Sequence, residues 1–83
     1  MVVRRDRCEI VIRILEICKQ PDTSKTKIVY QANLNFKSVE PYLKHLQKEG
    51  FIIKVGSHFR TLPRGDEALS CLKKMEDILG TMP

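Results

Sequence analysis

The 83-residue sequence has no tryptophan, and aromatic residues make up only 6% of it. Its four glycines form no glycine-rich run, so the loop that cradles phosphates in many nucleotide-dependent enzymes is missing. No nucleophile motif is present, and the two histidines have no carboxylate or cysteine partners at useful spacing. We therefore expect neither an enzyme nor a cofactor or metal site.

Cysteine is also scarce. Cys8, Cys18 and Cys71 are odd in number and form no C-x-x-C pair, which indicates reduced thiols rather than a disulfide framework. A thiol- or metal-sensing role for Cys8 and Cys71 across a dimer has no motif behind it. No apolar run approaches the roughly 20 residues that cross a bilayer, and no signal-peptide pattern opens the chain. We expect a cytoplasmic protein without membrane contact.

Positive charge is abundant and unevenly spread. The formal net charge is +5, and residues 1–30, 31–60 and 61–83 contribute +3, +3 and −1 respectively. The positive field thus belongs to the first three quarters of the chain, which is typical of a nucleic-acid-binding surface. The alternative interpretation is a solvated, mildly basic surface.

Helical periodicity opens the chain. Apolar spacings of three and four predict a helix over residues 6–19, ended by Pro21 because the residue before proline leaves the helical region. Thr23 or Ser24 suits the N-cap of a short helix from Lys25 to about Gln31, and Asn33 can take a left-handed turn conformation. The expected buried face of the first helix is Ile10, Val11, Ile14, Leu15 and Cys18.

A third helix, ending at Glu49-Gly50, has two distinct faces. Val39, Leu43 and Leu46 define its buried face. An exposed lysine row on a helix that follows a tight turn fits contact with phosphates and base edges, although lysines also favour exposed helix faces in general. The opposite face carries Lys37, Pro41, Lys44 and Lys48.

Pro41 leaves two positions open for the start of this helix. A start near Phe36 places the proline in the interior, where it deletes a backbone hydrogen bond. With Ser38 as the N-cap, Pro41 falls at the third helical position, where no donor is needed. We favour a weak first turn at Asn35 followed by a firm helix from Val39.

A hairpin and a last helix complete the pattern. Residues 51–55 and 58–62 read as strands joined by a Gly56-Ser57 turn. Pairing Val55 with His58 places Ile52 and Phe59 in the core and leaves Lys54, His58 and Arg60 exposed. Pro63 suits the first position of a helix that runs to about Leu79.

The order of these elements predicts a mostly helical α+β fold, a winged helix-turn-helix of three helices and a two-stranded wing with a C-terminal fourth helix. Residues 1–62 form the expected DNA-binding domain. Residues 63–83 form a helix that packs on the domain or pairs with a second copy. A small basic domain gains stability and a second half-site by pairing, so we expect a homodimer. The expected interface residues are Leu69, Leu72, Met75 and Leu79.

The sequence also resembles the archaeal winged-helix DNA-binding proteins, predicted transcriptional regulators that dimerise through a C-terminal helix. The most specific match is Lys-Thr-Lys-Ile-x-Tyr-x-Ala-Asn-Leu at residues 25–34, and the matching segments together cover nearly the whole chain in order. The resemblance implies double-stranded DNA as partner, the helix after Leu34 as recognition helix, the hairpin as wing and a dimer built on the last helix. The other matching segments are residues 5–7, 9–10, 14–18, 35–36, 42–43, 49–52 and 62–65.

The resulting hypothesis is a DNA-binding transcriptional regulator, with recognition helix 36–49 in the major groove and wing 51–62 on the backbone. No small-molecule effector is evident. The alternative is a winged-helix protein-interaction module, which exposed Ile53 and Val55 would favour. The candidate DNA contacts are Arg4, Arg5, Lys25, Lys27, Asn35, Lys37, Ser38, Lys44, His45, Lys48 and Arg60.

Overall fold

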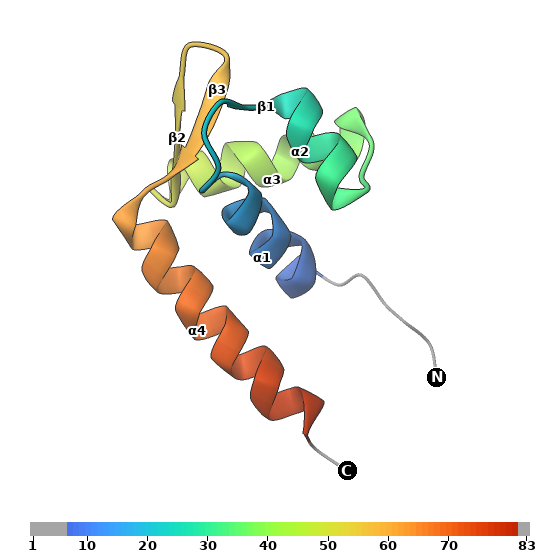
Figure 1. The fold of residues 1–83 in the computed structure, drawn as a ribbon, viewed down its shortest axis with the longest axis vertical. Helices are drawn as coiled ribbons and strands as arrows, with labels where there is room; N and C mark the ends of the chain where they lie inside the picture. Colours follow the sequence, from blue (N-terminus) through green and yellow to red (C-terminus); the bar gives the residue numbers. More distant parts are fainter. Residues whose placement is uncertain (1–6, 82–83) are drawn as a thin grey trace.

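The computed structural model describes residues 7–81, which form four helices and a small antiparallel sheet that lies at one edge of them (Figure 1). The predicted winged helix-turn-helix fold class is confirmed. None of the helices in this range is both long enough and apolar enough to cross a membrane. The elements in chain order are α1 (Arg7–Ile17), β1 (Thr23–Ser24), α2 (Lys25–Ala32), α3 (Phe36–Lys48), β2 (Ile52–Val55), β3 (His58–Thr61) and α4 (Pro63–Gly80).

The first helix is buried on more than one side. Packing of α2 against one flank of α1 and of α4 against another covers Ile12 and Ile17 as well as the predicted stripe. Val11, predicted to be in the core, is only half-buried. The single-stripe prediction for this helix was therefore too narrow, because α4 packs on it in addition to the elements of the helix-turn-helix.

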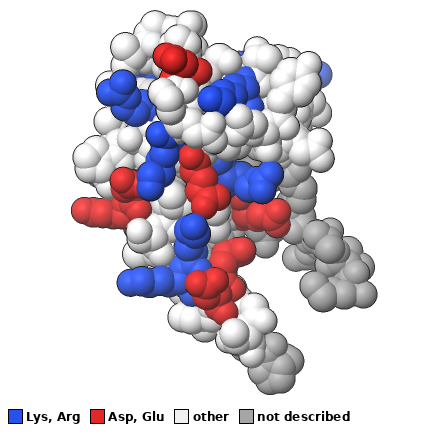
Figure 2. Space-filling view, in the orientation of Figure 1, with Lys and Arg blue, Asp and Glu red and all other residues white. Residues whose placement is uncertain are grey.

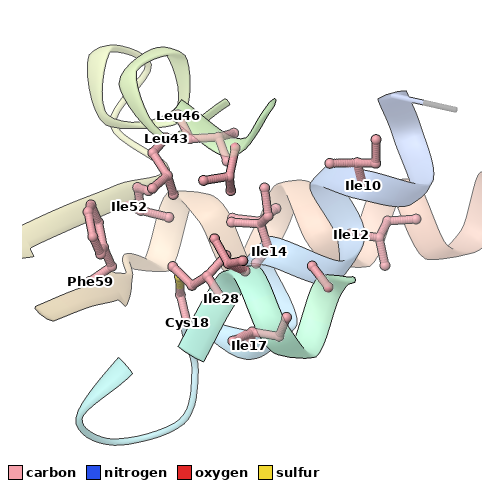
Figure 3. Packing of buried hydrophobic residues seen from close by; sticks show 14 of the residues in the cluster. Ile10, Ile12, Ile14, Ile17, Cys18, Ile28, Leu43, Leu46, Ile52 and Phe59 are labelled. Atoms are coloured by element: carbon pink, nitrogen blue, oxygen red, sulfur yellow. The ribbon is translucent and has the colours of Figure 1, made fainter. Parts of the chain in front are cut away.

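The hydrophobic core lies where α1 meets α2, α3 and the sheet. In Figure 3, Ile14 lies at the centre, with Leu43 and Leu46 of α3 on one side and Ile28 of α2 on the other. Ile14 and Ile28 are fully buried, and Leu43 and Leu46 are nearly so. This single cluster sets the position of α3 relative to the rest of the chain.

The carboxyl end of α1 is joined to the sheet by two threonines. The hydroxyl of Thr23 donates to the carbonyl oxygens of Ile17 (3.1 Å) and Gln20 (2.9 Å). The hydroxyl of Thr61 donates to the carbonyl of Leu15 (2.7 Å), and its amide donates to that of Cys18 (3.1 Å). Carbonyl groups that a helix end leaves without intrahelical donors are thereby satisfied.

A short strand that the sequence analysis missed lies beside the wing. Thr23 and Ser24 form β1, which pairs with Phe59 and His58 of β3, so the sheet has three strands in the order β1-β3-β2 rather than two. A two-residue strand has no periodicity to detect. Its residues were read only as N-cap candidates, and Ser24 does cap α2 by accepting the Lys27 amide.

The helix-turn-helix follows the predicted turn chemistry. Asn33 ends α2 in the left-handed conformation, with φ of 55°. Asn35 is the N-cap of α3, and its side chain accepts the Ser38 amide at 2.7 Å. Because α3 runs without a break from Phe36, the start near Phe36 is confirmed and the Ser38 cap is wrong. Pro41 lies in its interior, on its exposed surface.

The wing has the predicted register. Val55 pairs with His58 across the turn that contains Gly56, whose φ is 63°. Ile52 and Phe59 are buried. Each strand is one residue shorter than predicted, since β2 begins at Ile52 and β3 ends at Thr61.

The last helix begins at Pro63 as predicted and is only partly covered. Leu69 is 5% exposed within its own chain, and Leu72 is half-buried against the core. Further along, Met75 and Leu79 are 54% and 58% exposed. Figure 1 shows why: α4 continues beyond α1, and no other described element covers its far end. Leu69, predicted as a dimer contact, is thus already used in the fold of the single chain.

Gly65 permits a close approach between α4 and the start of the wing. A Cβ at this position would lie 2.1 Å from the carbonyl oxygen of Phe51. That oxygen also accepts the Leu62 amide at 2.9 Å, so it cannot move without loss of a hydrogen bond. The glycine is required here by the backbone that faces it, not by a special φ.

We expect Gly65→Ala to lower the free energy of unfolding by about 1–3 kcal/mol, the usual cost of overpacking. Urea denaturation followed by circular dichroism measures this change. Gly80→Ala is the matched control, since nothing lies within 4 Å of a Cβ there, and it should leave stability unchanged or raise it. Equal midpoints for Gly65→Ala and the unmodified protein would contradict the close approach.

Candidate nucleic-acid interface

The exposed face of α3 carries cations without acidic partners. Lys37, Lys44 and Lys48 are exposed, opposite the buried Val39 and Leu43. Three ion pairs lie within residues 7–81, and none involves these lysines or Arg60 of the wing. Their ammonium groups are available to bind an anionic ligand such as a phosphate.

The amino-terminal end of α3 carries two polar residues from the set of candidate DNA contacts. Both Asn35 and Ser38 are exposed. The side-chain oxygen of Asn35 is engaged in capping the helix through the Ser38 amide. Asn35 therefore has a structural role that the sequence analysis did not assign, and base contact by either residue stays a prediction.

The two lysines of α2 differ from those of α3. Lys25 is half-buried, pairs with the carboxylate of Glu40, and has its Nζ atom 5.8 Å from the centre of the Phe36 ring. Lys27 is also half-buried, with its Nζ atom 3.5 Å from the carbonyl oxygen of Pro21. Both ammonium groups already have partners within the chain.

The wing presents three basic side chains to solvent. Lys54, His58 and Arg60 are all exposed, whereas Phe59 between them is buried. The Nζ atom of Lys54 lies 5.8 Å from the Phe59 ring on the neighbouring strand. The wing can therefore offer cations beside those of α3, as predicted for Arg60.

His45 lies on a different flank of α3. It lines a groove of about 460 Å³ with Arg7 and Val11 of α1 and with Pro41, Tyr42 and Leu46 of its own helix. The neighbouring flank, where Glu40 pairs with Lys25, faces α2. His45 and Lys25 are therefore not brought together, although both were predicted to contact DNA. Arg4 and Arg5 lie outside the described residues.

The surface around α4 has mixed charge. Figure 2 shows acidic and basic side chains interspersed from the middle of the molecule to the end of this helix. Lys73 pairs with Glu16 of α1 at 3.0 Å, and Asp66 pairs with Lys19 at 3.1 Å. Cations near α4 are thus partly neutralised, in agreement with the net negative charge of residues 61–83.

Glu40 is the residue at this surface that the sequence analysis overlooked. The Lys25 hydrogen bond, together with the charges of Lys25, Lys44 and Lys54, holds the pKa of its carboxyl below the usual range despite some desolvation. The spacing of Glu40 and Lys44 by four residues was a signal for their proximity. No sequence signal linked Glu40 to Lys25, which belongs to another helix.

The described residues contain no group of three or more His, Cys, Asp and Glu side chains that could hold a metal ion. Burial raises the pKa of the Cys18 thiol to about 12, so this thiol is neutral at ordinary pH and acts as a small core residue. The exposed charged side chains of α3 and the wing are mostly positive, and Glu40 is the one carboxylate of α3.

Comparison with known proteins agrees with this architecture. A family model described as winged helix-turn-helix matches residues 4–80. Two relatives come from the archaeon Methanocaldococcus jannaschii, and both are called uncharacterized proteins. MJ0287 is 31% identical over 80 residues, which are 96% of this chain and 82% of the relative. MJ0290 is 34% identical over 76 residues, which are 92% of this chain but only 35% of the longer relative. The chain belongs to the winged helix-turn-helix family.

Proposed function

We propose that this protein binds double-stranded DNA and regulates transcription, with α3 in the major groove and the wing against the backbone. The observation that carries the proposal is the set of exposed lysines on α3, Lys37, Lys44 and Lys48, which have no ion-pair partners within residues 7–81. A helix-turn-helix presents its second helix to DNA in this way, and membership of the family supports the same role.

The predicted contacts fall into two groups. The lysines of α3 and Arg60 of the wing supply sequence-independent contacts with phosphates. Asn35, Ser38 and His45, on the first turns and the flank of α3, are the proposed sources of base contact. The side-chain oxygen of Asn35 caps the helix, so only its side-chain NH2 group is available for contact with a base.

The first prediction concerns salt. Fluorescence anisotropy of a labelled generic duplex should report binding that weakens linearly with the logarithm of salt concentration. The slope should be about 0.9 for each phosphate contacted. Failure to bind even at low salt would remove DNA as the partner of this domain.

Lys44→Ala should weaken binding and reduce the magnitude of the salt slope by about one unit, because one phosphate contact is lost. The same anisotropy titration measures both quantities. Lys74→Ala is the matched control, since Lys74 is an exposed lysine of α4, away from the proposed interface. A slope unchanged by Lys44→Ala would contradict the assignment of this residue.

We further propose that α4 pairs with its copy in a homodimer. Met75, Ile78 and Leu79 are each more than half exposed, although such side chains are usually buried. They lie in the carboxyl-terminal half of α4, and Figure 1 shows that this helix continues beyond α1. A second copy covering them would also place two recognition helices on one duplex.

The double substitution of Met75 and Leu79 by Glu should convert the dimer to a monomer, because it places charges in the proposed apolar interface. Light scattering coupled to size-exclusion chromatography measures the mass. The helix itself should survive, since both side chains are exposed in the single chain, and far-UV circular dichroism checks this. A wild-type protein that is monomeric at the concentrations used for DNA binding would refute the dimer.

One observation favours a second candidate function. Ile53 and Val55 are 42% and 60% exposed on β2, which is an edge strand of the sheet. An exposed apolar edge is a typical site for a protein partner. A winged-helix module in a transcription complex is therefore the alternative if the domain does not bind DNA.

A further inference from the structure

Glu40 is the sole acidic residue of α3, and it lies among lysines from three elements. Its carboxylate forms an ion pair with Lys25, the first residue of α2. The two side chains are 44% and 32% exposed, so the pair lies at the surface and is accessible to a ligand. Phe36 contributes a ring 5.8 Å from the same ammonium group, which helps to hold Lys25 in place.

Two further cations lie near the carboxylate. Lys44 follows Glu40 by four residues, which places both on the same side of the helix. Lys54 comes from β2, which packs against α3. Both charges contribute to the lowered pKa of the Glu40 carboxyl, so the group is ionised at neutral pH. One carboxylate thus pairs with Lys25 and also interacts electrostatically with Lys44 and Lys54.

This arrangement matches the requirements of a phosphate group. A DNA phosphate is an anion with oxygen acceptors, like the carboxylate, and lysine ammonium groups are its usual partners. Lys25 lies at the amino-terminal end of α2, where amide groups and the helix dipole also favour an anion. In the free protein the anion paired with the Lys25 side chain is Glu40.

We propose that Glu40 competes with DNA phosphates for Lys25 and thereby weakens sequence-independent binding. The inference rests on the proposed function. A phosphate that approaches Lys25 must displace the carboxylate or bind beside it, and either route lowers affinity for every duplex equally. Phosphate contacts carry no direct sequence information, so weakening them increases the share of binding that depends on base contacts.

The test is Glu40→Gln, which removes the charge and nearly preserves the shape. Anisotropy titrations of a generic duplex should give roughly fivefold tighter binding, the effect of removing one like charge about 4 Å from a phosphate in water. The salt slope should become steeper by about 0.9, since Lys25 then neutralises one more phosphate and the counterion of that phosphate is released from the DNA. Glu76→Gln changes the net charge equally on exposed α4 and should alter neither the affinity by this amount nor the slope.

A double-mutant cycle isolates the pair. Lys25→Gln should weaken binding in both backgrounds, because in the wild-type protein it leaves the Glu40 charge uncompensated. The loss should be larger in the Glu40→Gln background, where the freed ammonium group contacts a phosphate directly. Equal effects of Lys25→Gln in both backgrounds would overturn the competition. Far-UV circular dichroism and thermal unfolding of each variant verify that the fold is intact.

The remaining outcomes are also decisive. Unchanged or weaker generic binding by folded Glu40→Gln overturns the inference while leaving DNA binding in place; weaker binding would mean that the carboxylate makes a favourable contact, as with a cytosine amino group. If neither protein binds the duplex at low salt, the proposed function fails, and the inference fails with it.

Discussion

The position of the wing depends on hydrogen bonds at the carboxyl end of α1. The last carbonyl groups of a helix lack intrahelical donors, and leaving them buried and unpaired would cost free energy. Here Thr23 and Thr61, on two neighbouring segments of the sheet, donate to carbonyl oxygens in this region. The sheet is thereby attached to α1, while the buried Ile14 of the same helix packs with α3. The relative placement of α3 and the wing follows from these two sets of contacts.

The last helix depends on the same region. Leu62 donates its amide to the carbonyl of Phe51, and Gly65 lets α4 pass directly over that carbonyl. The helix then crosses α1, where Leu69 is buried, and leaves the domain with Met75 and Leu79 still exposed. One half of α4 therefore belongs to the core of the single chain. The other half has apolar surface that the single chain does not cover.

Much of this fold was predictable because its signals are local. The periodicity of α3 identified its buried residues, and Asn33 and the Gly56 turn supplied the expected backbone conformations. The errors arose where distant segments decide the outcome. Packing of α4 on α1 joins distant parts of the chain, β1 exists only through pairing with β3, and the Lys25–Glu40 pair joins two helices. In the candidate interface, exposure of the α3 lysines could be predicted, whereas the carboxylate among them required the tertiary structure.

The distribution of ion pairs separates the surface into two parts. Lys19 and Lys73 have acidic partners along α1 and α4, at exposed positions where such pairs add little stability. On α3, the lysines that lack partners repel one another, and that repulsion lowers stability until an anion binds. The negative charge of the Glu40 carboxylate offsets part of this repulsion in the free protein and so stabilises the fold. In the proposed function, the same charge would oppose the approach of a phosphate and would link the stability of the free domain to its affinity for any duplex.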